Sequence, residues 1–269
     1  MGSAQGDEID LSIGQFRDAW RIMCAGTPSL SAAVEEGVEF IFSGLPISFF
    51  NVALLTGRGV SGDELKSHGA HACAWAADKS VPWLFVVTHE AFADGVDAVS
   101  ILDGCGLAPM MALTGMAAEQ VGPVTHVPDG LQLTVPDDDT GCGLVLDMNS
   151  LAYGMDLEAG KPILGRRSFW ADHVPALGMV GTTPVSSATV LIVDGYRYVA
   201  LVATDPAQQR RGYAEATMRH ALEVAATRHA ELPTFLHASD AGRPIYQRMG
   251  YAPVATHTIF MEKRFLEGH

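Results

Sequence analysis

The chain has 269 residues, of which 48% are hydrophobic, and its formal net charge is −14. This length suits one large domain or two domains of ordinary size. The acidic balance argues against a nucleic-acid partner, because phosphate binding needs a basic face; it favours an amine substrate mildly, although acidity also serves solubility.

Membrane and metal-binding classes gain no support from the sequence. No apolar run is long enough to span a bilayer, and the polar segment 1–10 lacks a signal-peptide core, which predicts a cytoplasmic protein without a membrane partner. The tail 266–269 has the character of a vector remnant. No Cys-x-x-Cys pair or zinc spacing occurs, so we expect no metal and four core thiols, Cys24, Cys73, Cys105 and Cys142.

The first half carries the signals of alternating strands and helices. Residues 52–56 and 82–87 predict strands. Between them, Ser61 followed by Glu64 forms a capping box, which predicts a helix start. A further strand-like run follows Gly106-Leu107-Ala108-Pro109 and ends at Met116.

A segment rich in glycine, proline and polar residues, 120–129, predicts a join between two halves. Residues 131–135 alternate as in a strand, and residues 144–155 suit the first helix of the second half. The acidic stretch 136–139 between them predicts a turn, which is either solvated or faces an amine substrate.

The second half opens with a predicted hairpin. Residues 187–193 are rich in strand-forming types, Asp194-Gly195 is a strong two-residue turn signal, and residues 196–204 return. After a loop, apolar residues recur at helical spacing and predict one buried helix face: Ala214, Met218, Ala221, Leu222 and Ala225.

Two more elements are expected before the chain ends. Residues 233–238 predict a strand, after which Ser239 or Asp240 can cap a helix that contains Tyr246. Residues 254–261 then predict a last strand of the second half.

The loop between the hairpin and its helix has the chemistry of a pyrophosphate cradle. Gly212 permits close backbone approach, and the small side chain of Ala214 keeps the helix near a ligand. The N–H groups of the first helical turn face an anion with the positive end of the dipole. Arg210 and Arg211 add fixed positive charge.

The pattern Gln209-x-x-Gly212-x-Ala214 resembles the pyrophosphate loop of the GNAT superfamily, the acetyl-CoA-dependent N-acetyltransferases, where it is Gln/Arg-x-x-Gly-x-Gly/Ala. The segment 238–251 is similar to that family's second conserved block. The resemblance covers roughly residues 130 to 263. It implies an α/β fold with a mixed, mostly antiparallel sheet flanked by helices.

The resemblance also implies roles for particular residues. The strand 201–204 would pair with the pantetheine amides of acetyl-CoA, and the backbone N–H of Val202 would polarise the thioester carbonyl. Tyr246 would protonate the leaving thiolate, since a phenol pKa of about 10 suits a thiol; packing of its helix is the alternative. The implied cofactor-binding residues are Leu201, Val202, Ala203, Thr204, Gln209, Arg210, Arg211, Gly212, Tyr213, Ala214 and Ser239.

A general base is harder to assign, because the strand 196–204 contains no carboxylate. Either water accepts the proton of the substrate amine, or a residue from another part of the chain acts as the general base. Asp172 and His173 are candidates by residue type, although surface or packing roles suit them better. We expect His237 to be a satisfied core histidine, and Arg243 to be a solvated charge or to bind a substrate carboxylate.

The first half echoes the second in three places: residues 52–56, 82–87 and 106–109 parallel 199–204, the strand after Pro233, and 250–253. Its helix start carries acidic residues that repel a phosphate, and no Gln-x-x-Gly-x-Ala follows. We therefore predict two tandem GNAT-like domains: residues 1–128 without a cofactor site, and residues 129–265 with it.

The favoured function is an acetyl-CoA-dependent N-acetyltransferase that acts by direct transfer on a small-molecule or peptide amine, as a monomer or homodimer. Two alternatives remain open. The first alternative is a non-catalytic acyl-CoA sensor or scaffold, which the missing strand carboxylate allows. The second is a transferase that uses a longer acyl chain.

Overall fold

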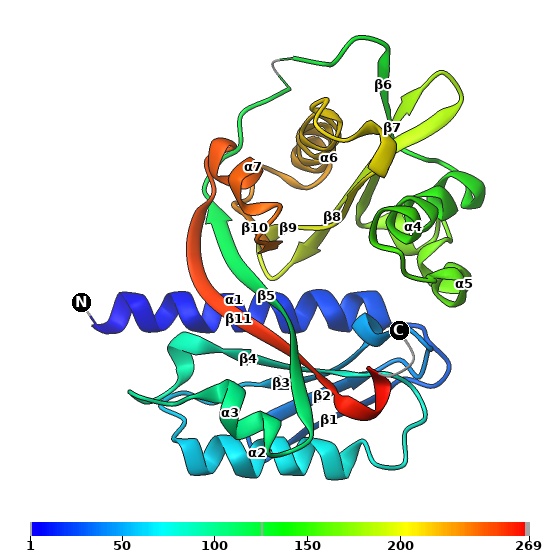
Figure 1. Ribbon diagram of the computed structural model, residues 1–269. Coiled ribbons are helices and arrows are strands. Elements are labelled where there is room, and N and C mark those ends of the chain that lie inside the picture. Colours follow the sequence, from blue (N-terminus) through cyan, green and yellow to red (C-terminus); the bar gives the residue numbers. More distant parts are fainter. Residues whose placement is uncertain (1, 125, 267–269) are drawn as a thin grey trace. The chain divides into compact units, whose positions relative to one another are not determined.

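The computed structural model describes residues 2–124 and 126–266, in which the chain forms two compact units (Figure 1). Within this part, no helix has the length and hydrophobicity needed to cross a membrane. Of the expected vector remnant, residues 267–269 lie outside the description. The first unit comprises the described residues of Met1–Gly115, Ala238–Ala241 and Pro253–His269, and the second comprises those of Met116–His237 and Gly242–Ala252.

The first unit has the strand order β1-β2-β3-β4-β11-β5. Strands β1, β2 and β3 pair antiparallel in succession, and β3 pairs parallel with β4. Its elements are α1 (Gly2–Cys24), β1 (Ser31–Glu35), β2 (Val38–Phe42), β3 (Asn51–Leu55), α2 (Gly62–Trp75), β4 (Leu84–Thr88), α3 (Ala98–Asp103), β5 (Leu107–Ala118) and β11 (Ala252–Glu262).

The last strand, β11, belongs to the first unit, although we expected it in the second. It pairs antiparallel with β4, from His257 opposite Thr88 to Met261 opposite Leu84. Phe260 is fully buried in the apolar core of this unit. The observed units therefore differ from the expected ranges 1–128 and 129–265, because the partner of β11 lies far away in sequence.

The second unit has the strand order β10-β9-β8-β7-β6. Strands β6 to β9 pair antiparallel in succession, and β9 pairs parallel with β10, so the pairing types repeat those of the first unit. This confirms the expected α/β class with mixed sheets. Its elements are β6 (Leu131–Thr134), α4 (Asp139–Tyr153), α5 (Lys161–Leu164), β7 (Val174–Val180), β8 (Thr183–Val193), β9 (Tyr196–Thr204), α6 (Tyr213–His229), β10 (Thr234–Ser239) and α7 (Arg243–Arg248).

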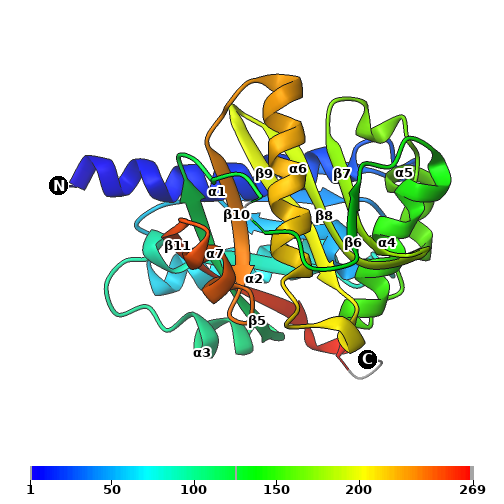
Figure 2. The same cartoon turned by 90° about the horizontal axis from the view of Figure 1, so that it is seen from above.

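Helices α4 and α6 cover opposite faces of this sheet, and Figure 2 shows α6 lying over β8. Successive strand residues point to opposite faces: on β8, the Ser186 hydroxyl bonds Thr217 of α6 at 2.7 Å, while Ser187 accepts a bond from Asn149 of α4 at 3.1 Å. The close approach of α6 requires Gly178 on β7, because a Cβ there would lie 2.7 Å from the Thr217 hydroxyl oxygen.

Two local predictions are confirmed. Asp194 and Gly195 form the turn between β8 and β9, with φ values of 40° and 76°. Ser61 and Glu64 form the capping box at the start of α2: each side chain accepts from the other residue's backbone N–H.

Two helix starts differ from expectation. The helix expected over 144–155 begins at Asp139, because the Asp138 side chain caps it by accepting from the N–H of Gly141. The expected cap by Ser239 or Asp240 is wrong: the N-cap of α7 is Gly242, which makes no side-chain cap bond.

Candidate functional site

Strands β9 and β10 pair as parallel neighbours over three residues only. The register runs from Arg197 opposite Thr234 to Val199 opposite Leu236. Both strands continue beyond this point, β9 to Thr204 and β10 to Ser239. In a parallel sheet, the carboxyl ends of neighbouring strands are a common place for a ligand.

A β-bulge interrupts β9 where this pairing stops. Ser187 pairs with Ala203 and Thr189 with Ala200, so Leu201 and Val202 of β9 lie opposite a single residue of β8. Leu201 has a φ of 50°, a conformation that costs a non-glycine residue about 1 kcal/mol or more. Such bulges redirect the backbone and its polar groups.

Side chains of α4 and β8 hold the carbonyl groups of the bulge. The Leu201 oxygen accepts from the Asn149 amide and from the Ser187 hydroxyl, each at 3.1 Å. The Tyr153 hydroxyl donates to the next oxygen, that of Val202, at 2.6 Å. Asn149 and Tyr153 were not predicted from the sequence, because no motif links α4 to a strand that begins more than forty residues later.

The predicted pyrophosphate loop connects β9 to α6. Asp205 caps a short turn over Pro206–Gln208 by accepting from the N–H of Ala207 at 2.9 Å. Arg210 and Gly212 have φ values of 62° and 81°, so both residues adopt the left-handed backbone conformation that favours glycine.

The N-terminus of α6 has no capping side chain, because its N-cap is Gly212. At most helix starts a side chain caps the first N–H groups. Because no side chain does so here, the first N–H groups of α6 remain available to a ligand. Gln209, Arg210 and Arg211 are exposed beside them. Among the described residues, neither arginine has an ion-pair partner. Tyr213, by contrast, is buried, and Ala214 is half-buried in the first turn.

Tyr246 lies on α7 and packs edge-on against Tyr251, with ring centroids 6.0 Å apart. Burial raises the pKa of Tyr246, and Tyr153 adds to the shift, which shows that the two phenols are electrostatic neighbours. In the described part of the chain, its hydroxyl has no hydrogen-bond partner. The phenol therefore stays protonated at neutral pH, and its proton is not donated to another described group.

Tyr153 differs from Tyr246 in its exposure. Its residue is 58% exposed, yet its hydroxyl is bonded to the bulge, and desolvation raises the pKa of this phenol. Tyr153, Tyr246 and the Val202 backbone thus form a group that the sequence did not predict as a whole.

The general-base candidates have structural roles. His173 accepts from the N–H of Ile192 at 3.2 Å, and burial lowers its pKa. His237 is hydrogen-bonded as expected, because its Nδ1 lies 2.8 Å from the hydroxyl of the fully buried Tyr198, but the residue is half-buried and not in the core. Asp172 is exposed and ends the short turn before β7.

The remaining predicted residues lie outside this group. Asp139 of the acidic turn binds Arg166 and the N–H of Arg167, so its carboxylate already serves the fold. Arg243 is exposed at the start of α7. Ser239 ends β10 in a segment of the first unit, and its binding role stays a prediction.

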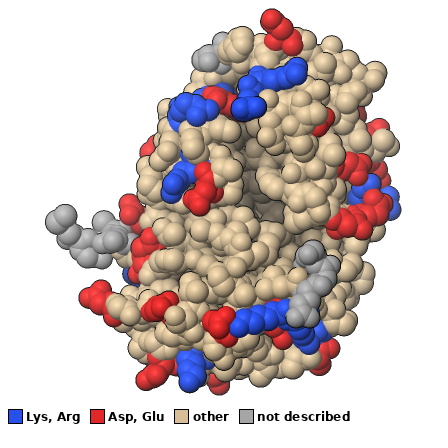
Figure 3. All heavy atoms as spheres, in the orientation of Figure 1, with Lys and Arg blue, Asp and Glu red and all other residues tan. Residues whose placement is uncertain are grey.

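Charge on the surface is mixed. On the face drawn in Figure 3, basic and acidic side chains occur in small neighbouring groups, without a broad basic area. Within residues 2–124 and 126–266, no three metal-binding side chains gather at one place.

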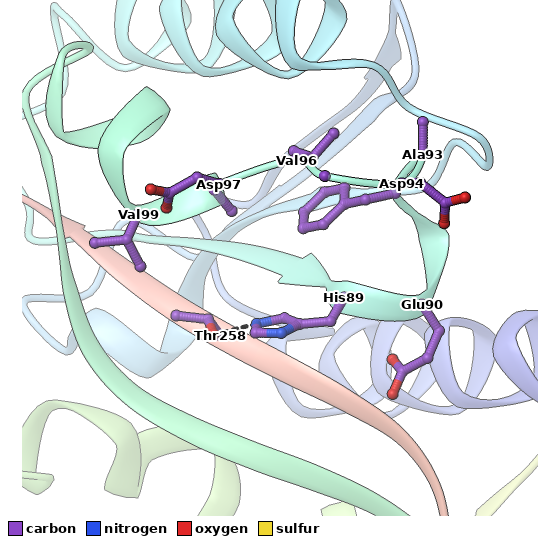
Figure 4. Close-up of a pocket in the computed structure, with 11 residues that line it drawn as sticks. His89, Glu90, Ala93, Asp94, Val96, Asp97, Val99 and Thr258 are labelled. Atoms are coloured by element: carbon purple, nitrogen blue, oxygen red, sulfur yellow. Dashed lines mark hydrogen bonds between the residues drawn. The ribbon is translucent and has the colours of Figure 1, made fainter.

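A cavity of about 510 Å³ lies in the first unit (Figure 4). Three of its polar side chains already make bonds within the fold. The ring of His89 bonds the Thr258 hydroxyl at 2.6 Å, and Glu90 accepts twice from the N–H of Thr256. Asp97 caps α3. None of the predicted cofactor-binding residues lines this cavity.

Comparisons with known proteins agree with the fold. A GCN5-related N-acetyltransferase from Kribbella flavida superposes with a TM-score of 0.69 at 19% identity, covering 94% of this chain and 95% of that one. A tandem GNAT protein from the clavulanic acid biosynthesis pathway has a TM-score of 0.53 at 12% identity, with coverages of 83% and 77%. A Staphylococcus epidermidis protein of unknown function reaches 0.61 at 12% identity, with coverages of 87% and 94%.

No curated protein matches the chain. Residues 179–265 match the family model of the acetyltransferase (GNAT) domain. This range contains the hairpin β8–β9, the loop with Gly212, α6 and Tyr246. The part of the chain that ends in β11 is therefore similar to a GNAT acetyltransferase domain.

Proposed function

We propose that the chain is an acetyl-CoA-dependent N-acetyltransferase that acts on a primary amine of a small molecule or peptide. The observation that carries this proposal is the bulge at Leu201 together with the uncapped N-terminus of α6, the next helix along the chain. The two features offer backbone groups to two parts of one ligand, its thioester and its pyrophosphate.

The pyrophosphate would bind at the start of α6. The N–H groups after Gly212 donate to its oxygens, and the positive end of the helix dipole faces its charge. Arg210 and Arg211 are exposed cations beside this helix start. They counter the repulsion that a chain of net charge −14 exerts on a phosphate.

The thioester would lie along β9. Because β9 is unpaired with β10 beyond Val199, its backbone can pair with the pantetheine amides as an added strand would. The N–H of Val202 then donates to the thioester carbonyl oxygen and stabilises the negative charge that develops there.

Transfer proceeds in a ternary complex. The neutral amine attacks the carbonyl carbon, the C–S bond breaks, and the thiolate of CoA takes the proton of Tyr246. Burial keeps the Tyr246 phenol protonated before the reaction, and it also makes this phenol a weaker acid than a free tyrosine. The amine proton leaves through water, since β9 has no carboxylate.

The same missing carboxylate favours a second candidate, a non-catalytic acyl-CoA sensor. The two functions separate in a release assay: purified chain is mixed with acetyl-CoA and a panel of amino acids, polyamines, aminoglycosides and peptides, and free thiol is measured. Thiol release that depends on one amine supports the transferase. Acetyl-CoA binding without release for any amine supports the sensor.

A further inference from the structure

The bulge of β9 is held by side chains that the proposed reaction does not otherwise use. Asn149 and Ser187 are almost fully buried, with exposed fractions of 2% and 0%. Both donate to the oxygen of Leu201. Tyr153 holds the oxygen of Val202, so two consecutive peptide groups are fixed by side chains.

These bonds determine where the Val202 N–H points. All described peptide bonds are trans, and in a trans peptide the C=O and N–H of one unit point in opposite directions. The oxygen of Leu201 points toward Asn149 and Ser187, so the N–H of Val202, which belongs to the same peptide unit, points away from α4. The positive φ of Leu201 is the backbone turn that produces this orientation.

The two bonds to the Leu201 oxygen also change the strength of the Val202 N–H as a donor. Hydrogen bonds to a peptide oxygen polarise the unit and strengthen its N–H as a donor, and the effect is greater in a buried, low-dielectric setting. Asn149 is itself fixed, because its amide also donates to the oxygen of Val145 at 2.8 Å. The Asn149 amide is therefore fixed between the oxygens of Val145 and Leu201.

We propose that Asn149 and Ser187 are positioning residues that aim and polarise the Val202 N–H at the thioester carbonyl, and that Tyr153 helps to aim it by holding the next peptide unit. This inference rests on the proposed function. The alternative is that the three side chains merely satisfy two carbonyls that the bulge leaves without ladder partners.

A spectroscopic experiment distinguishes the positioning role from the purely structural role. Acetyl-CoA labelled with ¹³C at the acetyl carbonyl is bound to the full chain, and its C=O stretch is compared with that of the free ligand by difference infrared spectroscopy. A donor aimed at the oxygen lowers this frequency. Ser187→Ala should reduce the lowering, and turnover with an accepted amine should fall by roughly two- to tenfold, as expected for one net hydrogen bond.

Thr189→Val is the matched control. The Thr189 hydroxyl also lies on β8 and donates to a β9 carbonyl, that of Ala200, at 2.9 Å, but in the regular ladder beside the bulge. Its loss should leave the carbonyl frequency as in the wild type. Tyr153→Phe, at an exposed position, is a second variant in case Ser187→Ala prevents folding. It should change the carbonyl frequency and the turnover in the same direction as Ser187→Ala.

The outcomes are distinct. A wild-type chain that binds no acetyl-CoA overturns both the proposed function and this inference. The inference alone is overturned if acetyl-CoA binds normally and its carbonyl frequency is the same in the wild type, Ser187→Ala and Tyr153→Phe. If these variants also have lower thermal stability, the three side chains serve only to stabilise the fold.

Discussion

Acidification should weaken the first unit through His257, which is fully buried where β11 meets α1 and β4. Its Nε2 lies 2.8 Å from the Ser12 hydroxyl oxygen and its Nδ1 lies 3.0 Å from that of Thr88. Burial lowers the pKa of His257 to about 3, and the neighbouring His89 contributes.

The sign and size of the effect follow from linkage. The unfolded chain binds a proton at His257 below a pKa of about 6.5, whereas the folded chain does so only near pH 3. Stability contributed by the neutral ring is therefore present above pH 6.5 and is lost as the pH falls toward 3. Between pH 7 and pH 5 the loss is about 2 kcal/mol.

Urea unfolding at pH 7 and pH 5, followed by tryptophan fluorescence, measures this loss. Trp20, Trp75 and Trp83 lie in the first unit, so three of the four tryptophans report on it. His257→Gln should remove about 2 kcal/mol of the pH dependence, whereas the exposed His126→Gln should keep it. Equal pH dependence in the wild type and His257→Gln would show that His257 does not cause the loss of stability.

Three further outcomes test the second unit. Gly212→Glu should abolish acetyl-CoA binding in calorimetry, because its charge and bulk occupy the start of α6; Gly181→Glu, at a turn of similar positive φ with open space around it, should bind as the wild type does. Tyr246→Phe should slow turnover by about ten- to ten-thousand-fold at nearly unchanged acetyl-CoA affinity, and full activity would assign the residue to packing. Gly178→Ala should destabilise the chain by about 1–3 kcal/mol in thermal or urea unfolding, because its Cβ would crowd Thr217; an unchanged midpoint would contradict the close approach of α6.

Local signals in the sequence predicted much of the second unit. The turn at Asp194-Gly195, the return strand and the helix after Gly212 depend on neighbouring residues, so their patterns are readable without a structure. The same holds for the capping box of Ser61 and Glu64.

Features that depend on distant partners could not be predicted in this way. The residues of β11 form a strand pattern, but nothing in that pattern names β4 as the neighbour. The segment of β9 contains no glycine or proline to mark the bulge at Leu201, which is stabilised by Asn149 and Tyr153 from α4. The long helix α1 was missed, although its buried residues Ile9, Ile13, Phe16 and Trp20 recur at helical spacing.

We expect one functional acyl-CoA site per chain, at β9 and the start of α6. Calorimetric titration of the purified chain with acetyl-CoA and with free CoA tests this expectation. Binding should be micromolar, with one equivalent per chain, and Tyr246→Phe should bind equally. No binding of either ligand, or two equivalents per chain, would contradict this expectation.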